Sequence, residues 1–128
     1  MAAEYLFLCS MGQNRSPTAA EVAAKIVEER GFEAEVCYGG IDFVIEECQG
    51  DKSGEACRKY RERFQQYDMI FVMESYMQRA LLKAGVEKRK IQCLDIPDEY
   101  KRNEPLLVEI LENSLRARIG FKDTWQSV

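Results

Sequence analysis

The chain has 128 residues, 46% of them hydrophobic, and a formal net charge of −4. This length is typical of one domain, so we expect a single domain over residues 1–128. The acidic balance argues against general binding of nucleic acid or of anionic membranes. No apolar run reaches the roughly 18 residues of a membrane span. The start Met1–Glu4 lacks the basic residues of a secretory signal, so we expect a cytoplasmic protein. The sequence leaves the oligomeric state open, and we favour a monomer.

The cysteine and histidine content restricts the possible chemistry. Five cysteines form an odd set without a Cys-x2-Cys pair, and the chain has no histidine. A disulfide framework and a structural zinc site are therefore not expected, and we expect no metal and no cofactor. A cysteine nucleophile would have no histidine partner. It would depend on backbone amides, hydroxyls and arginine for its activation.

The first half of the chain predicts a βαβ unit. Tyr5–Leu8 has the apolar character of a buried strand, and Ser16–Arg30 has a helical apolar stripe. Phe32–Tyr38 is predicted to be a second strand that ends at Gly39-Gly40, reached by a right-handed crossover. The acidic stretch Ile41–Gly54 is the least readable, and we expect a loop or a short helix there.

The second half continues the alternation of helices and strands. After a charged helix at Gly54–Gln66, we expect strands at Asp68–Met73 and Lys90–Leu94 with a helix at Ser75–Ala84 between them. A loop at residues 95–102 and a helix at residues 104–119 complete the chain. Four strands alternating with helices predict an α/β fold, a doubly wound open parallel sheet with helices on both faces. Ligands of such sheets bind outside the carboxyl ends of the strands.

The first predicted strand runs into a Cys-x5-Arg-Ser loop from Cys9 to Ser16. A strand, a glycine-containing loop and a helix start in this order are typical of a phosphate-binding loop, in which backbone N–H groups surround a dianion and stabilise a thiolate. Ser16-Pro17 fits a helix N-cap followed by proline at the first helical position. Cys57–Arg63 has the same spacing, but it lies among long charged side chains without a glycine or a preceding strand. We interpret that second match as a chance occurrence on an exposed helix.

The residue types of the loop suit the cleavage of a phosphate monoester. Cys9 is the candidate nucleophile, and Arg15 offers a planar fork to two phosphoryl oxygens. The Ser16 hydroxyl is a candidate for stabilising the thiolate, with its N-cap role as the alternative. The remaining candidate substrate-binding residues contribute the loop itself, and they are Ser10, Met11, Gly12, Gln13 and Asn14.

A second acidic loop supplies candidates for the general acid that protonates the leaving oxygen. Asp95, Asp98 and Glu99 all lie between the fourth strand and the last helix. We favour Asp98 because it lies past Pro97 in the exposed half of the loop, whereas Asp95 continues the strand and is suited to holding backbone amides. Tyr100 is a candidate aromatic wall for the ring of a substrate.

Three blocks of this sequence resemble the low-molecular-weight protein tyrosine phosphatase superfamily, and within it a short prokaryotic branch of predicted tyrosine phosphatases. They are Cys9-Ser10 through Arg15-Ser16-Pro17-Thr18-Ala19, Ile70-Phe71-Val72-Met73-Glu74, and Leu94-Asp95-Ile96-Pro97-Asp98-Glu99-Tyr100. The resemblance implies a doubly wound fold without a metal and catalysis through a cysteinyl-phosphate. It also implies Cys9 as nucleophile, Arg15 on the phosphate and the aspartate of the acidic loop as acid. The expected partner is a phosphorylated protein or a small aryl phosphate.

The sequence departs from this family in two places, which keeps alternatives open. The family usually has an asparagine three residues after the cysteine, where Gly12 stands here, and Asn14 follows two residues later. Ile41–Gly54 also differs from the usual segment, which leaves substrate selectivity open. The alternatives are an arsenate reductase on the same fold, relaying a disulfide through Cys48 and Cys57, and a non-catalytic phosphate-binding module. A third is a phosphoserine phosphatase that acts on the RNA polymerase C-terminal repeat, because residues 13–16 resemble a stretch of that phosphatase group.

Overall fold

The protein is a four-stranded parallel sheet between two layers of helices. The computed structural model describes residues 3–31 and 33–119. The strand order is β2-β1-β3-β4. The two central strands, β1 and β3, are also the most apolar ones. The strands are β1 Ala3–Cys9, β2 Ala34–Gly40, β3 Met69–Val72 and β4 Ile91–Cys93, and all neighbouring pairs are parallel.

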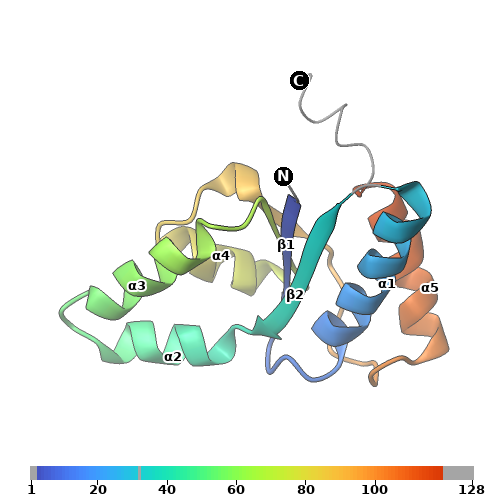
Figure 1. The fold of residues 1–128 in the computed structure, drawn as a ribbon. Coiled ribbons are helices and arrows are strands. Elements are labelled where there is room, and N and C mark those ends of the chain that lie inside the picture. Colours follow the sequence, from blue (N-terminus) through green and yellow to red (C-terminus); the bar gives the residue numbers. More distant parts are fainter. Residues whose placement is uncertain (1–2, 32, 120–128) are drawn as a thin grey trace.

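The helices divide between the two faces of the sheet, which confirms the predicted doubly wound fold. Figure 1 shows α1 (Arg15–Arg30) and α5 (Pro105–Arg116) together on one side, with α4 (Ser75–Lys83) on the other. Beside α4 lie α2 (Asp42–Gly50) and α3 (Glu55–Phe64), which extend away from the sheet. A short 3-10 turn at Lys88–Lys90 leads into β4.

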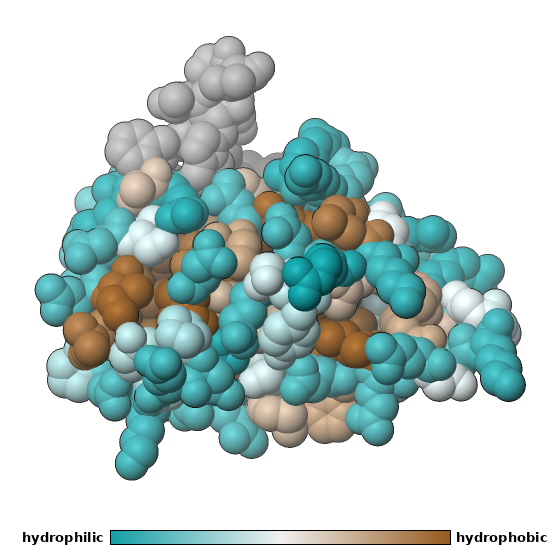
Figure 2. Space-filling view, turned by 180° about the vertical axis from the view of Figure 1, so that it is seen from behind, coloured by the Kyte–Doolittle hydropathy of each residue, from teal (hydrophilic) through white to brown (hydrophobic). Residues whose placement is uncertain are grey.

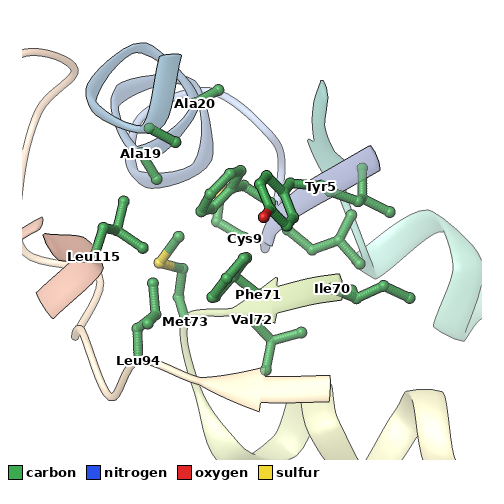
Figure 3. Close-up of a cluster of buried hydrophobic side chains, with 14 of the residues drawn as sticks. Tyr5, Cys9, Ala19, Ala20, Ile70, Phe71, Val72, Met73, Leu94 and Leu115 are labelled. Atoms are coloured by element: carbon green, nitrogen blue, oxygen red, sulfur yellow. The ribbon is translucent and has the colours of Figure 1, made fainter. Parts of the chain in front are cut away.

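The core forms around β1 and β3 because both strands are covered on both faces. Phe7 and Phe71 are fully buried and their rings stack with centroids 4.8 Å apart, while Tyr5 meets Phe71 edge to face. Figure 3 shows α1 laying Ala19 and Ala20 over this cluster, with Leu115 of α5 beside them. Continuous apolar strands are what a buried parallel sheet requires. The same packing fixes the ends of β1 and β3 from which the candidate site is built.

The surface is mainly polar. Figure 2 shows the side opposite to the view of Figure 1 as predominantly hydrophilic, with hydrophobic side chains in separate groups. Among the described residues, the large exposed apolar side chains are spread over several elements, and they are Met11, Tyr38, Phe43, Leu82 and Leu106. Dispersed apolar side chains of this kind are ordinary on protein surfaces. Among the described residues, none of the helices has both the length and the apolar character to cross a bilayer.

Of the two alternatives expected for residues 41–54, the structure has the short helix, the nine-residue α2. Other details at the ends of elements differ from the predictions. The second strand was expected to stop at Tyr38, before Gly39 and Gly40, but these two glycines are its last two residues. The predicted first residue, Phe32, lies outside the described residues. The prediction that Ser16 caps the first helix is also wrong. The helix begins at Arg15, with Asn14 in the N-cap position.

Candidate active site

The phosphate loop, residues 10–14, joins the end of β1 to the start of α1 at the carboxyl edge of the sheet. Its first residues are fixed by the chain that leaves β2. The Ile41 N–H donates to the Cys9 carbonyl at 2.9 Å, and the Asp42 N–H donates to the Ser10 carbonyl at 3.1 Å. In contrast, the N–H groups of residues 11–14 donate no hydrogen bond to any described residue. These amides at a helix N-terminus are available to an anion.

Gly12 allows the phosphate loop to rest directly on the end of β2. Its φ of 71° is left-handed, and a Cβ added there would lie 2.9 Å from the Gly39 carbonyl carbon and from the Gly40 nitrogen. A Cβ on Gly40 would in turn lie 2.7 Å from the Met11 carbonyl carbon. Backbone therefore packs on backbone here, with no room for a side chain on either partner. An asparagine at position 12 would bring its Cβ against the same backbone atoms.

The Cys9 thiol lies at the base of the loop, buried, with a hydroxyl beside it. Its Sγ is 3.1 Å from Ser16 Oγ, and the Ser16 hydroxyl donates to the Gly39 carbonyl at 3.1 Å. A hydroxyl has one proton to donate. While Cys9 is a thiol, its S–H can donate to Ser16 Oγ, whereas a thiolate would accept the Ser16 proton. Ser16, the second residue of α1, is thus placed to stabilise the thiolate. This is the functional role considered for Ser16 from the sequence.

Arg15 is 1% exposed, and its guanidinium is held from two other strand ends. One terminal nitrogen, Nη1, donates to Glu74 Oε2 at 2.9 Å and to the Ile96 carbonyl at 2.7 Å. The other, Nη2, is buried and has no hydrogen-bond partner among the described residues. A buried guanidinium nitrogen normally has a partner. The unused Nη2 is therefore the position from which an oxyanion would be bound.

Glu74 was not among the residues selected from the sequence. It directly follows the buried run of β3 and precedes α4, so it is at a strand carboxyl end, like Cys9. That position was its only signal, since an acidic residue before a helix is also an ordinary solvent-exposed residue. Its carboxylate offsets the buried charge of Arg15 and fixes the direction of the guanidinium.

Asp98 and Cys9 line the same small pocket of about 80 Å³. Its Oδ1 is 3.8 Å from Arg15 Nε, a charge contact longer than a hydrogen bond. Asp95 is oriented differently, with a left-handed φ of 55° and its carboxylate 3.4 Å from Cys93 Sγ. The pocket is lined by Cys9, Ser10, Met11, Gln13, Asn14, Arg15 and Asp98. The geometry thus brings together most of the predicted residues and favours Asp98 over Asp95 as the acid.

Three of the predicted residues do not line this pocket as the described residues define it. Gly12 instead packs against Gly39 and Gly40, and Ser16 contacts the Cys9 sulfur. Tyr100 is partly buried and packs against the hydrophobic core, away from the lining. Within residues 3–31 and 33–119, no three acidic or cysteine side chains are arranged to hold a metal ion.

The fold is found in solved structures of phosphatases. A protein tyrosine phosphatase of Entamoeba histolytica, with Hepes in its active site, is 19% identical and has a TM-score of 0.68, covering 98% of this chain and 99% of its own. A low-molecular-weight phosphotyrosine phosphatase of Vibrio cholerae is 18% identical, with a TM-score of 0.63 and coverage of 98% and 97%. Wzb of Vibrio vulnificus, in complex with benzylphosphonate, is 22% identical, with a TM-score of 0.62 and coverage of 91% and 97%.

Neither a protein-family model nor a curated protein sequence matches the chain. Likeness at these low identities establishes the fold alone. The chain has the α/β fold of low-molecular-weight protein tyrosine phosphatases, as the sequence predicted.

The contact between Gly12 and β2 can be tested with a matched pair of substitutions. Gly12→Ala and Gly31→Ala both place a side chain at a φ near 70°, but a Cβ at Gly31 meets nothing within 4 Å. We expect Gly31→Ala to cost about 1 kcal/mol of unfolding free energy. Gly12→Ala should cost about 2–4 kcal/mol because the clash adds to the same conformational cost. It should also weaken the binding of inorganic phosphate at least roughly tenfold.

Denaturant unfolding and calorimetric titration with phosphate measure the two effects. Equal stability losses in the two variants, with phosphate binding unchanged in Gly12→Ala, would show that the close approach of loop and strand is unimportant.

Proposed function

We propose that the protein hydrolyses phosphate monoesters, as a protein tyrosine phosphatase, through a cysteinyl-phosphate on Cys9. The observation that carries the proposal is the buried Arg15 guanidinium, which lines the same pocket as Cys9 and Asp98 and whose Nη2 has no partner among the described residues. A guanidinium fork, free loop amides and a helix N-terminus all favour a dianionic phosphoryl group. The likeness of the fold to solved tyrosine phosphatases supports the same reaction class.

In the first step, the Cys9 thiolate attacks phosphorus in line with the ester oxygen. The S–P bond forms while the P–O bond breaks, and its electron pair stays on the leaving oxygen, which takes the proton of Asp98. The loop amides and Arg15 stabilise the charge that spreads over the equatorial oxygens. The Ser16 hydroxyl, 3.1 Å from Sγ, stabilises the thiolate before attack and again when sulfur departs.

In the second step, water attacks the phosphorus of the thiophosphate ester. The Asp98 carboxylate accepts a proton from that water, and the S–P bond breaks with its electron pair returning to Cys9. Inorganic phosphate leaves, and both side chains regain their starting protonation states. The cycle consumes one water for each ester. Cys9 and Asp98 carry out its bond-forming and proton-transfer steps.

We infer that the substrate is a phosphorylated protein or a small aryl phosphate. Met11, half exposed at the pocket, gives an apolar contact beside the phosphate loop, where a ring attached to the phosphate would lie. Vibrio vulnificus Wzb carries a benzylphosphonate ligand, which supports an aryl group in this position. All five cysteines are free thiols, which fits the expected cytoplasmic location.

The arsenate reductase alternative receives no support from the cysteine positions. Cys48 and Cys57 line a different pocket of about 310 Å³, formed by α2, α3 and α4, and Cys9 does not line it. Burial, followed by the hydrogen bond with Cys57, raises the pKa of the Cys48 thiol to about 12. A disulfide relay needs a thiolate that attacks the sulfur of Cys9. Neither Cys48 nor Cys57 lines the pocket at the phosphate loop, so their positions do not favour a relay from Cys9.

The two Cys-x5-Arg sequences provide a direct test of the nucleophile. Cys9→Ser should lower the rate of aryl phosphate hydrolysis by at least roughly 1000-fold, because a serine hydroxyl in this site has no base to activate it. Cys57→Ser should keep the wild-type rate, since Cys57 lies on α3 beside the separate pocket. Steady-state hydrolysis of an aryl phosphate measures both variants. Activity that survives in Cys9→Ser would refute the proposed function.

The identity of the acid can be tested with a second matched pair. Asp98→Asn should lower kcat roughly 100-fold for an ester of a weakly acidic phenol, and it should abolish the fall in rate toward alkaline pH. Asp95→Asn should keep that fall, because asparagine also adopts the left-handed conformation that Asp95 has. pH–rate profiles of both variants decide the question. An Asp95→Asn variant that behaves as expected for Asp98→Asn would reassign the acid.

A further inference from the structure

The acid loop, residues 95–103, is anchored at both ends and carries Asp98 between the anchors. At its start, the Ile96 N–H donates to the Met73 carbonyl at 2.8 Å, and the Ile96 carbonyl accepts from Arg15. At its end, Asn103 has a left-handed φ of 61°, a conformation that asparagine tolerates. Both ends of the loop therefore have defined backbone positions.

The anchor at the end of the loop comes from the start of α1. The Arg102 N–H donates to Asn14 Oδ1 at 3.1 Å, and the Asn103 N–H donates to Thr18 Oγ1 at 2.9 Å. The Thr18 hydroxyl donates in turn to the Asn14 carbonyl at 2.8 Å. Asn14 also lines the pocket as the last residue of the phosphate loop. The segment that would bind the phosphate is thus bonded directly to the loop that carries the acid.

We propose that Asn14 and Thr18 are positioning residues that hold the acid loop, and with it Asp98, over the phosphate loop. This inference rests on the proposed phosphatase function. It assigns to Asn14 a contact between two loops, with Arg102, which is 88 positions away in sequence.

Asp98 needs such anchors because its own side chain is weakly held. The carboxylate is 61% exposed, and its ion pair with Arg15 Nε is 3.8 Å long. Water reaches the carboxylate of this pair although Arg15 is buried, and the long separation makes it a weak hold on Asp98. The pair between Arg102 and Glu21 at the end of the loop is also exposed. The Thr18 side chain, in contrast, is buried, and its two hydrogen bonds are partly shielded from solvent. A displacement of about 1 Å at a reacting group can cost about 100-fold in rate.

A comparison of leaving groups tests this role. An acid that is misplaced affects esters of weakly acidic phenols most, because strongly acidic phenols depart without a proton. Asn14→Ala and Thr18→Val should each lower kcat roughly tenfold for a weakly acidic leaving group and less than about twofold for a strongly acidic one. Thr18→Ser keeps the hydroxyl and should restore the wild-type ratio. Glu21→Gln, which removes only the exposed ion pair, should also keep it.

Hydrogen exchange gives a second readout that does not depend on turnover. In Thr18→Val and Asn14→Ala, the amides of Arg102 and Asn103 should exchange about five- to tenfold faster, whereas core amides of β1 should be unchanged. Equal rate losses for all leaving groups, or unchanged exchange at both amides, would overturn the inference. If the wild type hydrolyses neither ester, the proposed function fails, and exchange at these two amides alone decides whether the anchor exists.

Discussion

A buried arginine joins the strand ends from which the candidate site is made. Arg15 follows β1, Glu74 follows β3, and Ile96 follows β4, and the guanidinium contacts both of the latter. An isolated charge in a protein interior costs several kcal/mol, so the guanidinium requires these partners. One carboxylate and one carbonyl satisfy Nη1, and Nη2 has no partner among the described residues. The geometry that keeps Arg15 buried therefore also leaves a donor for the phosphoryl group of the proposed reaction.

The glycines of the loop and of β2 complete this arrangement from the other side. Gly12 lies against Gly39 and Gly40 with no space for a Cβ, which places the phosphate loop against β2. The Gly39 carbonyl also accepts from Ser16, whose hydroxyl is beside the Cys9 sulfur. Contacts from β2 on one side and from β3 and β4 on the other thus define the positions of the thiol and the guanidinium. The Cys9 thiol, the Arg15 guanidinium and the candidate acid Asp98 are positioned by backbone contacts more than by contacts with one another.

Much of this could be predicted from the sequence because the signals are local. The apolar runs of β1 and β3 predict buried parallel strands, and a strand, a cysteine, a glycine and an arginine in order predict the phosphate loop. The acidic residues after β4 predict a second loop at the same edge, since the carboxyl ends of parallel strands lie together. The choice of Asp98 over Asp95 as the acid, made from its place beyond Pro97, stays a prediction.

The parts that could not be predicted depend on contacts between distant segments. Glu74 resembles a solvated residue before a helix until the position of Arg15 is known. Ser16 fits an N-cap equally well, and only the start of α1 at Arg15 assigns its hydroxyl to Cys9. The sequence shows Asn14 only as an asparagine two residues beyond the usual position of the family, because its partner, Arg102, is remote in the sequence. The acidic helix α2 was unreadable because only Val44 of its residues is buried, which leaves little apolar periodicity.

The most direct test of this account is to identify the residue that receives the phosphoryl group. An ester with a strongly acidic phenol should form the intermediate faster than water removes it. The reaction can be stopped by denaturant within the first turnover, and its peptides examined by mass spectrometry. The account predicts one phosphoryl group on the peptide that contains Cys9 and none on the peptide that contains Cys57. Phenol release in that first turnover without phosphorylation of Cys9, or with phosphorylation of another residue, would contradict it.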